Sequence, residues 1–134
     1  MATQIFVNLH VKDLNKSVKF FTKLGYTFNP QFTNEQATCM IISDDICVML
    51  LVEPFFQSFT KKDIVDTKKA QECIIYLSAE SKANVDDIIN KAVDAGAIPK
   101  SRNDYGWMYQ HSFEDLDGHL WEYGWMDPAG PPQQ

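Results

Sequence analysis

The sequence predicts an α+β domain built from two similar halves, each with the order strand, helix and three strands (βαβββ). Short segments in which apolar and polar residues alternate are typical of strands, and one such segment precedes a helix-like segment while three follow it. This order of elements occurs twice along the chain. Gly25 and Gly96, which close the two helices, lie 71 residues apart (96 − 25), and Ile46 and His119, which open the two last strands, lie 73 apart (119 − 46). We therefore expect tandem modules that form a curved mixed sheet, a half-barrel, around a central cavity, with the helices outside.

The first module is predicted to span residues 4–53. Residues 5–11 alternate between apolar and polar side chains, as in a half-buried strand. Asp13 is a suitable N-cap for the helix that follows, and Gly25 is a suitable residue to end it. Three strands are then expected at about 26–32, 36–43 and 46–52.

The second module, 72–126, repeats this pattern. A strand is expected at 73–79, followed by a helix that Asn84 caps and Gly96 ends. Further strands are expected near 98–101, 107–114 and 119–125.

Residues 54–71 are predicted to link the modules, and residues 127–134, rich in Pro and Gly, to form a surface tail. The linker carries Phe55, Phe56 and Phe59. We interpret it as a linker held to the sheet by its aromatic side chains. A lid over a pocket is the alternative.

Composition narrows the possible partners and the compartment. A formal charge of −6 over 134 residues argues against nucleic acid, because phosphate binding needs a basic face. No apolar run reaches the roughly 18 residues of a membrane span. Cys39, Cys47 and Cys73 are odd in number and have apolar neighbours, which is typical of free thiols in a reducing compartment. We expect a cytoplasmic protein.

The stretch from Phe113 to Glu122, FEDLDGHLWE, resembles the F-x-D-P-D-G-x-x-x-E signature of the vicinal oxygen chelate superfamily. That superfamily includes glyoxalase I, fosfomycin resistance enzymes, extradiol dioxygenases and bleomycin-binding proteins. Residues 7–14, VNLHVKDL, are similar to its opening strand and helix. The resemblance covers about 5–126 and is closest to the group labelled predicted lactoylglutathione lyases. It implies a small-molecule ligand in the sheet cavity and a homodimer.

Enzymes of this superfamily hold a divalent metal ion with His or Glu side chains, and the resemblance implies four such positions: Phe6, Met49, Glu72 and Glu122. A phenyl ring cannot coordinate, and hard or borderline ions need several nitrogen or oxygen donors. We expect an incomplete metal site and no tightly bound cofactor. The alternative is a divalent ion (Ni, Zn, Mn or Fe) held by Glu72, Glu122 and an unusual third ligand such as His10.

Strand alternation also selects candidate ligand-binding residues. Glu122 is the candidate catalytic residue, either as a base or as a ligand for a cation; a carboxylate bonded only to water or a neighbour is the alternative. Four polar side chains share its side of the sheets, and two aromatic residues form either a clamp for a flat ligand or core and dimer packing. In order, these residues are Asn8, His10, Gln110, Ser112, Trp107 and Tyr109.

Three functions remain compatible with these residues. The first is a glyoxalase-like protein that binds a small organic ligand in its cavity, with metal chemistry reduced or lost. The second is a working metal-dependent lactoylglutathione lyase-type enzyme. The third is a drug-sequestering protein of the bleomycin-resistance kind, with which an acidic chain is compatible.

Overall fold

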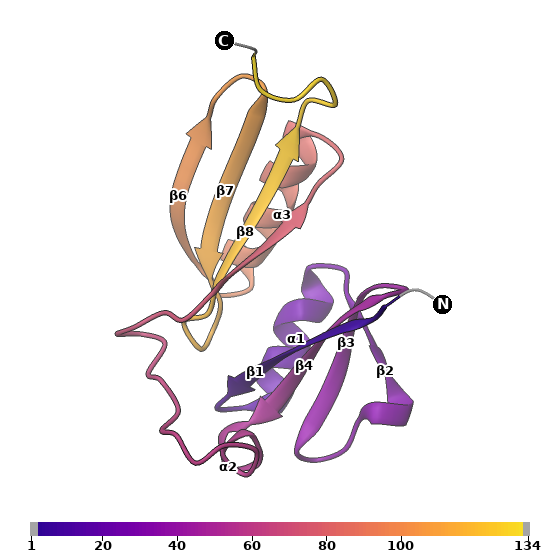
Figure 1. Cartoon of the computed structure of the whole chain (residues 1–134), viewed down its shortest axis with the longest axis vertical. Helices are drawn as coiled ribbons and strands as arrows, with labels where there is room; N and C mark the ends of the chain where they lie inside the picture. The colour runs from indigo at the N-terminus through magenta and orange to yellow at the C-terminus, as the bar shows by residue number, and fades with distance from the viewer. Residues whose placement is uncertain (1–2, 133–134) are drawn as a thin grey trace. The chain divides into compact units, whose positions relative to one another are not determined.

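The computed structural model describes residues 3–132, and it divides into two compact units between Val65 and Asp66 (Figure 1). Each unit contains one βαβββ module and one mixed four-stranded sheet. The predicted α+β class and the predicted duplication are both confirmed.

The first unit has its strands in the order β1-β4-β3-β2. β1 runs parallel to β4, whereas the other neighbours are antiparallel. Helix α1 lies against one face of this sheet (Figure 1). The elements are β1 (Ile5–Val11), α1 (Leu14–Lys23), β2 (Thr27–Asn29), the 3-10 turn η1 (Pro30–Phe32), β3 (Ala37–Ser43), β4 (Ile46–Val52) and α2 (Glu53–Gln57).

Helix α1 begins and ends where its sequence predicts. The Asp13 carboxylate accepts a hydrogen bond from the Lys16 backbone N–H at 3.1 Å, which satisfies one of the free donors of the first turn. After the helix, Gly25 has φ +103°, a value that favours glycine. The residues that α1 and the sheet bury together include Leu9, Val11 and Phe21.

The strand predicted at 26–32 ends at Asn29, which is shorter than expected. Pro30 has no backbone N–H to donate to a neighbouring strand, and the Asn29 side chain accepts from the Gln31 N–H at 2.9 Å. These two features turn the chain into η1 instead of extending β2.

The second unit repeats the arrangement with the strand order β5-β8-β7-β6, in which β5 is parallel to β8. Helix α3 covers one face of its sheet (Figure 1). The elements are β5 (Ile74–Ser78), α3 (Lys82–Asp94), β6 (Ile98–Asp104), β7 (Met108–Glu114) and β8 (Leu120–Met126).

The N-cap of α3 is Ser81, so the prediction that Asn84 caps this helix was wrong. The Ser81 hydroxyl accepts from the Asn84 N–H at 3.0 Å, and the Asn84 side-chain oxygen accepts from the Glu80 N–H at 3.2 Å. Asn84 therefore occupies the third helical position of a reciprocal capping arrangement. A serine three residues before it was the signal for the earlier start.

A buried carboxylate organises the turn between β7 and β8. Asp115 accepts hydrogen bonds from the backbone N–H groups of Asp117 (2.9 Å) and His119 (3.0 Å). Its second oxygen accepts from the Trp121 indole N–H at 2.9 Å. Burial raises the pKa of the Asp115 carboxyl, while these donors and His119 oppose the shift because they favour the charged form. One side chain thus fixes both the turn and the largest buried ring of β8.

The last residues of the predicted linker are attached to this turn. The Thr67 hydroxyl donates to the Asp117 carbonyl, and the Gln71 amide donates to the Gly118 carbonyl at 2.7 Å. Gly118 has φ +87°, and a Cβ there would lie 2.8 Å from the Thr67 carbonyl oxygen. Only glycine meets both the conformational and the steric requirement at this position.

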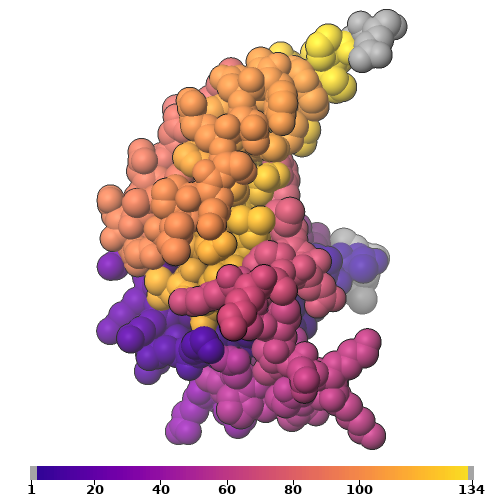
Figure 2. All heavy atoms as spheres, turned by 90° about the vertical axis from the view of Figure 1, so that its left-hand side faces the viewer, coloured from indigo at the N-terminus to yellow at the C-terminus, as the bar shows by residue number. Residues whose placement is uncertain are grey.

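The earlier part of the linker lies at the surface. In the space-filling view the segment around residue 60, coloured magenta, extends side chains outward (Figure 2). Lys61, Lys62 and Asp63 are exposed. No helix between residues 3 and 132 has the length and hydrophobicity that crossing a membrane would require.

We predict that Asp115→Ala lowers the free energy of unfolding by roughly 3 kcal/mol or more, because three buried N–H donors lose their acceptor. Urea unfolding followed by tryptophan fluorescence measures the loss. Asp63→Ala, which removes an exposed aspartate, is the matched control and should change stability by less than about 0.5 kcal/mol. Equal stability of the two variants would contradict the role given to Asp115.

Candidate functional site

Each sheet has a second face that its long helix does not cover, which we call the open face. In the first sheet it carries the even-numbered residues of β1 and the odd-numbered residues of β4, because Asn8 pairs with Met49 and His10 with Leu51. In the second sheet it carries Tyr76, Glu122 and Ser112, which pair across β5, β8 and β7. The predicted polar residues Asn8, His10, Gln110 and Ser112 all have the parity of these open faces.

The open face of the first sheet contributes to a pocket of about 400 Å³. This volume is within the range of small-molecule sites. Three of the lining residues are apolar and two are polar, and they come from β1, β4, α2 and the turn after α2. The lining residues are Asn8, Leu51, Phe56, Phe59 and Thr60.

Residues 53–60 form one wall of this pocket. The Gln57 side chain donates to the carbonyls of Thr60 (2.9 Å) and Lys62 (2.8 Å), which folds the turn after α2 back on itself. Phe59 contacts Phe55 edge to face with ring centroids 5.0 Å apart, yet 70 % of Phe59 is exposed. Part of the segment predicted as a linker therefore lies over the open face, as in the alternative interpretation of it as a lid.

His10 lies beside this pocket rather than in its lining. Its ring packs edge to face against Phe56 at 5.4 Å between centroids, and the residue is buried. His10 thus supports the aromatic wall. Asn8, by contrast, is exposed and lines the pocket, and its side-chain amide donates to the Phe6 carbonyl at 3.3 Å.

Glu122 is half-buried on the open face of the second sheet. Its carboxylate makes no hydrogen bond or ion pair with any residue between 3 and 132. Burial raises the pKa of this carboxyl above its ordinary value, because the charged form loses hydration. A carboxyl with a raised pKa can accept or release a proton nearer to neutral pH than an exposed one.

Tyr76 is the neighbour of Glu122 on β5, and the sequence analysis missed it. Burial and the charge of Glu122 both raise the pKa of the Tyr76 hydroxyl. This hydroxyl is buried and has no hydrogen-bond partner among the described residues. A Cβ at Gly124 would lie 2.1 Å from it, so the missing side chain of Gly124 makes room for the Tyr76 ring. The glycine inside a strand was the available signal.

The strand register shows which residues lie opposite the positions that the superfamily resemblance implied for a metal. In the second sheet the partner of Glu122 is Tyr76, whereas Glu72 is exposed and lies two residues before β5 begins. In the first sheet the partner of Met49 is Asn8, whereas Phe6 pairs with Cys47. By the duplication, the equivalent positions are Asn8 and Met49 in one unit and Tyr76 and Glu122 in the other.

Neither pair of side chains fits a hard or borderline divalent ion. Asn8 and Met49 offer one amide oxygen and one thioether, and Tyr76 and Glu122 offer one phenol and one carboxylate, whereas such ions are held by several carboxylate or imidazole donors. Within residues 3–132, no three His, Cys, Asp or Glu side chains are grouped so that they could hold a metal ion. We derive no metal-dependent step from this donor set.

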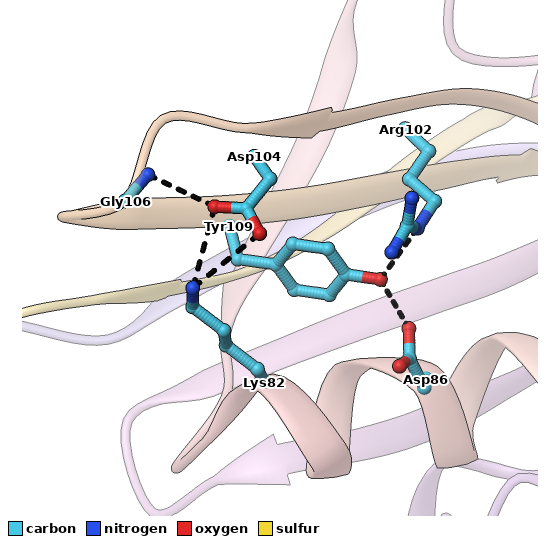
Figure 3. Close-up of polar contacts among 6 residues, drawn as sticks. All are labelled: Lys82, Asp86, Arg102, Asp104, Gly106 and Tyr109. Carbon is cyan, nitrogen blue, oxygen red and sulfur yellow. Dashed lines mark hydrogen bonds and ion pairs between the residues drawn. The ribbon is translucent and has the colours of Figure 1, made fainter.

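Tyr109 faces α3 and not the open face, in contrast to the predicted aromatic clamp (Figure 3). Its hydroxyl donates to the Asp86 carboxylate of α3 and accepts from the Arg102 guanidinium at 2.8 Å. The residue is only 2 % exposed. Its odd parity on β7 already placed it opposite Gln110 and Ser112, so it serves packing between helix and sheet.

Around Tyr109, charged groups join α3 to the hairpin of β6 and β7. Lys82 forms an ion pair with Asp104 at 3.3 Å, and its ammonium lies 5.8 Å from the Trp125 ring centroid. Asp104 also accepts from the Gly106 N–H at 2.9 Å (Figure 3). Trp107, the other predicted clamp residue, is half-buried, and its carbonyl accepts from the Asp127 N–H. Every carboxylate and cation drawn here has a partner, so this cluster is structural.

Comparison with known proteins agrees with the fold. The profile of a family described as bleomycin resistance protein-like N-terminal matches residues 3–43. No curated protein sequence matches the chain. Among solved structures, hypothetical protein SA1046 from S. aureus is 28 % identical with a TM-score of 0.77, and the match covers 92 % of this chain and 93 % of that one.

Two further solved structures support the same conclusion. A glyoxalase/bleomycin resistance protein/dioxygenase family enzyme from Burkholderia phytofirmans is 14 % identical, with a TM-score of 0.76 over 93 % of this chain and 99 % of that one. A glyoxalase-related enzyme from Fulvimarina pelagi is 16 % identical, with a TM-score of 0.79 over 99 % and 94 %. At these identities the likeness shows the fold. The chain has the fold of these glyoxalase/bleomycin resistance proteins, the vicinal oxygen chelate fold.

We predict that Glu122→Gln becomes more stable than the wild type as the pH rises. The raised pKa of Glu122 means that its favourable contribution is complete below the pKa of the unfolded chain, about 4.3, and is lost as the pH rises through the folded value. The stability difference should therefore be smallest near pH 4 and grow toward pH 8 in urea unfolding. Glu35→Gln, at an exposed position, is the control. A difference that stays constant with pH would contradict the burial of Glu122.

Proposed function

We propose that this glyoxalase/bleomycin-resistance-like chain binds a small, flat and largely apolar organic molecule in the pocket of its first unit. We further propose that it does so without a divalent metal ion. The observation that carries the proposal is the pocket of about 400 Å³ on the open face, with Phe56 and Phe59 in its wall.

The chemistry of the lining selects the ligand class. Leu51, Phe56 and Phe59 offer apolar and aromatic surface, on which a planar ring system packs well. Asn8 and Thr60 add a neutral amide and a hydroxyl, which can bond one polar group of the ligand. Among the described residues, none of the side chains that line the pocket is charged, so a neutral ligand of one or two rings fits it better than a strongly ionic one.

Binding is better supported than metal-dependent turnover. The lyase alternative needs an ion that polarises the substrate, and the residue opposite Glu122 on β5 is Tyr76, a phenol and not a histidine or carboxylate. Glu72 and Glu122, the residues predicted to bind metal, are not among the described residues that line the pocket. A homodimer stays a prediction from the superfamily resemblance.

We predict that 2-naphthol, a flat two-ring probe with one hydroxyl, binds the wild-type protein, and that Phe59→Ala weakens its binding roughly fivefold or more through loss of an aromatic contact. Isothermal titration calorimetry measures the dissociation constant. Because Phe59 is 70 % exposed, its loss should leave folding intact. Phe32→Ala removes another exposed ring (54 %) outside the lining and is the control. Equal affinity of both variants would refute the pocket as the binding site.

We predict that treatment with EDTA, and later addition of nickel or zinc, leaves the 2-naphthol dissociation constant within about twofold, because no lining residue needs a metal ion. The same preparations should not turn over the methylglyoxal–glutathione adduct. If the protein turned over this adduct only with added metal, and Glu122→Gln abolished the turnover, the lyase alternative would be established and the metal-free proposal refuted.

A further inference from the structure

Three sulfur atoms share the open face of the first sheet. Cys39 pairs with Met49 across β3 and β4. Cys47 pairs with Ile41, two residues nearer to the turn between these strands. All three sulfur-bearing residues have odd numbers on antiparallel neighbours, so their side chains project from the same face. Cys39 and Cys47 are diagonal neighbours, and Met49 lies directly opposite Cys39.

The two thiols are close and unequally buried. Cys39 is 1 % exposed, whereas Cys47 is half-buried. Burial raises the pKa of the Cys39 thiol to about 11, and a hydrogen bond and charge from Cys47 contribute to the shift. Cys47 is therefore the more accessible of the two thiols.

We propose that Cys39 and Cys47, with the Met49 thioether as a third donor, form a binding site for a soft monovalent metal ion, copper(I). Thiolate and thioether ligands are those that favour Cu(I) over harder cations. Zinc is excluded as the preferred ion because its structural sites need four donors. On binding, each thiol gives up its proton and each sulfur donates an electron pair to the ion, so the metal is neither oxidised nor reduced.

A bridging ion suits the diagonal geometry better than a disulfide does. Diagonal neighbours have Cα atoms about 7–8 Å apart, and two cysteines beyond about 7 Å cannot form a disulfide without movement of the backbone. Two metal–sulfur bonds of about 2.3 Å each span about 4.6 Å, more than twice an S–S bond. The pair can therefore hold an ion while the sheet keeps its register.

The test is a titration of the reduced, metal-free protein with Cu(I) in competition with bicinchoninate, together with thiolate-to-copper charge-transfer absorption. We expect one Cu(I) per chain and an affinity that rises with pH as protons are released. Cys39→Ser and Cys47→Ser should each weaken binding about 100-fold or more, and Met49→Leu less. Cys73→Ser is the matched control, because Cys73 is an exposed cysteine of the second unit and should leave binding unchanged.

Cys47→Ser keeps the test valid even if serine at the buried position 39 impairs folding. An unchanged affinity in Cys47→Ser would overturn the proposal, as would an equal loss in Cys73→Ser. Oxidised glutathione offers the competing chemistry: a Cys39–Cys47 disulfide detected by mass spectrometry of tryptic peptides would identify the pair as a redox bridge and also overturn it. Failure of 2-naphthol binding would leave this site unaffected.

Discussion

The structure depends on one constraint: each four-stranded sheet has a single long helix, which can cover only one of its two faces. Strand residues of one parity then form the core, such as Leu9 and Val11 under α1 or Trp121 and Tyr123 in β8. Residues of the other parity are available for chemistry. In the first unit, α2 and the turn after it cover part of that second face, and the pocket lies between them.

The motif that connects this chain to the glyoxalase-like proteins is a structural one. Asp115 holds the turn between β7 and β8, Gly118 adopts a conformation that suits glycine, and Phe113 is fully buried. Of the residues that the motif specifies by type, Glu122 is the one that a strand places on the open face. A match to such a motif therefore identifies the fold reliably, while the chemistry depends on open-face residues that the motif does not include.

The sequence was sufficient for the local structure and insufficient for the register between strands. Alternation and the glycines after each helix located the strands and both long helices, because these signals depend on near neighbours, although the cap of α3 was assigned to the wrong residue. Which residue lies opposite Glu122 or Met49 depends on a distant parallel strand, so the sequence did not identify Tyr76 and Asn8 as their partners. A shift by an even number of residues preserves parity, so hydrophobic patterning does not detect it. α2 was missed because its five residues are too few to show a helical period.

The attachment of Thr67 and Gln71 to the turn around Gly118 determines where an independently folding second half has to start. A fragment that begins at the first residue of β5 would contain every strand and the helix of the second module. It would nevertheless leave the carbonyls of Asp117 and Gly118 without these donors and uncover the glycine that Thr67 packs against. The boundary between the two units therefore lies inside the segment that joins the duplicated modules, near residue 66. The part of that segment after the boundary belongs to the structure of the second unit.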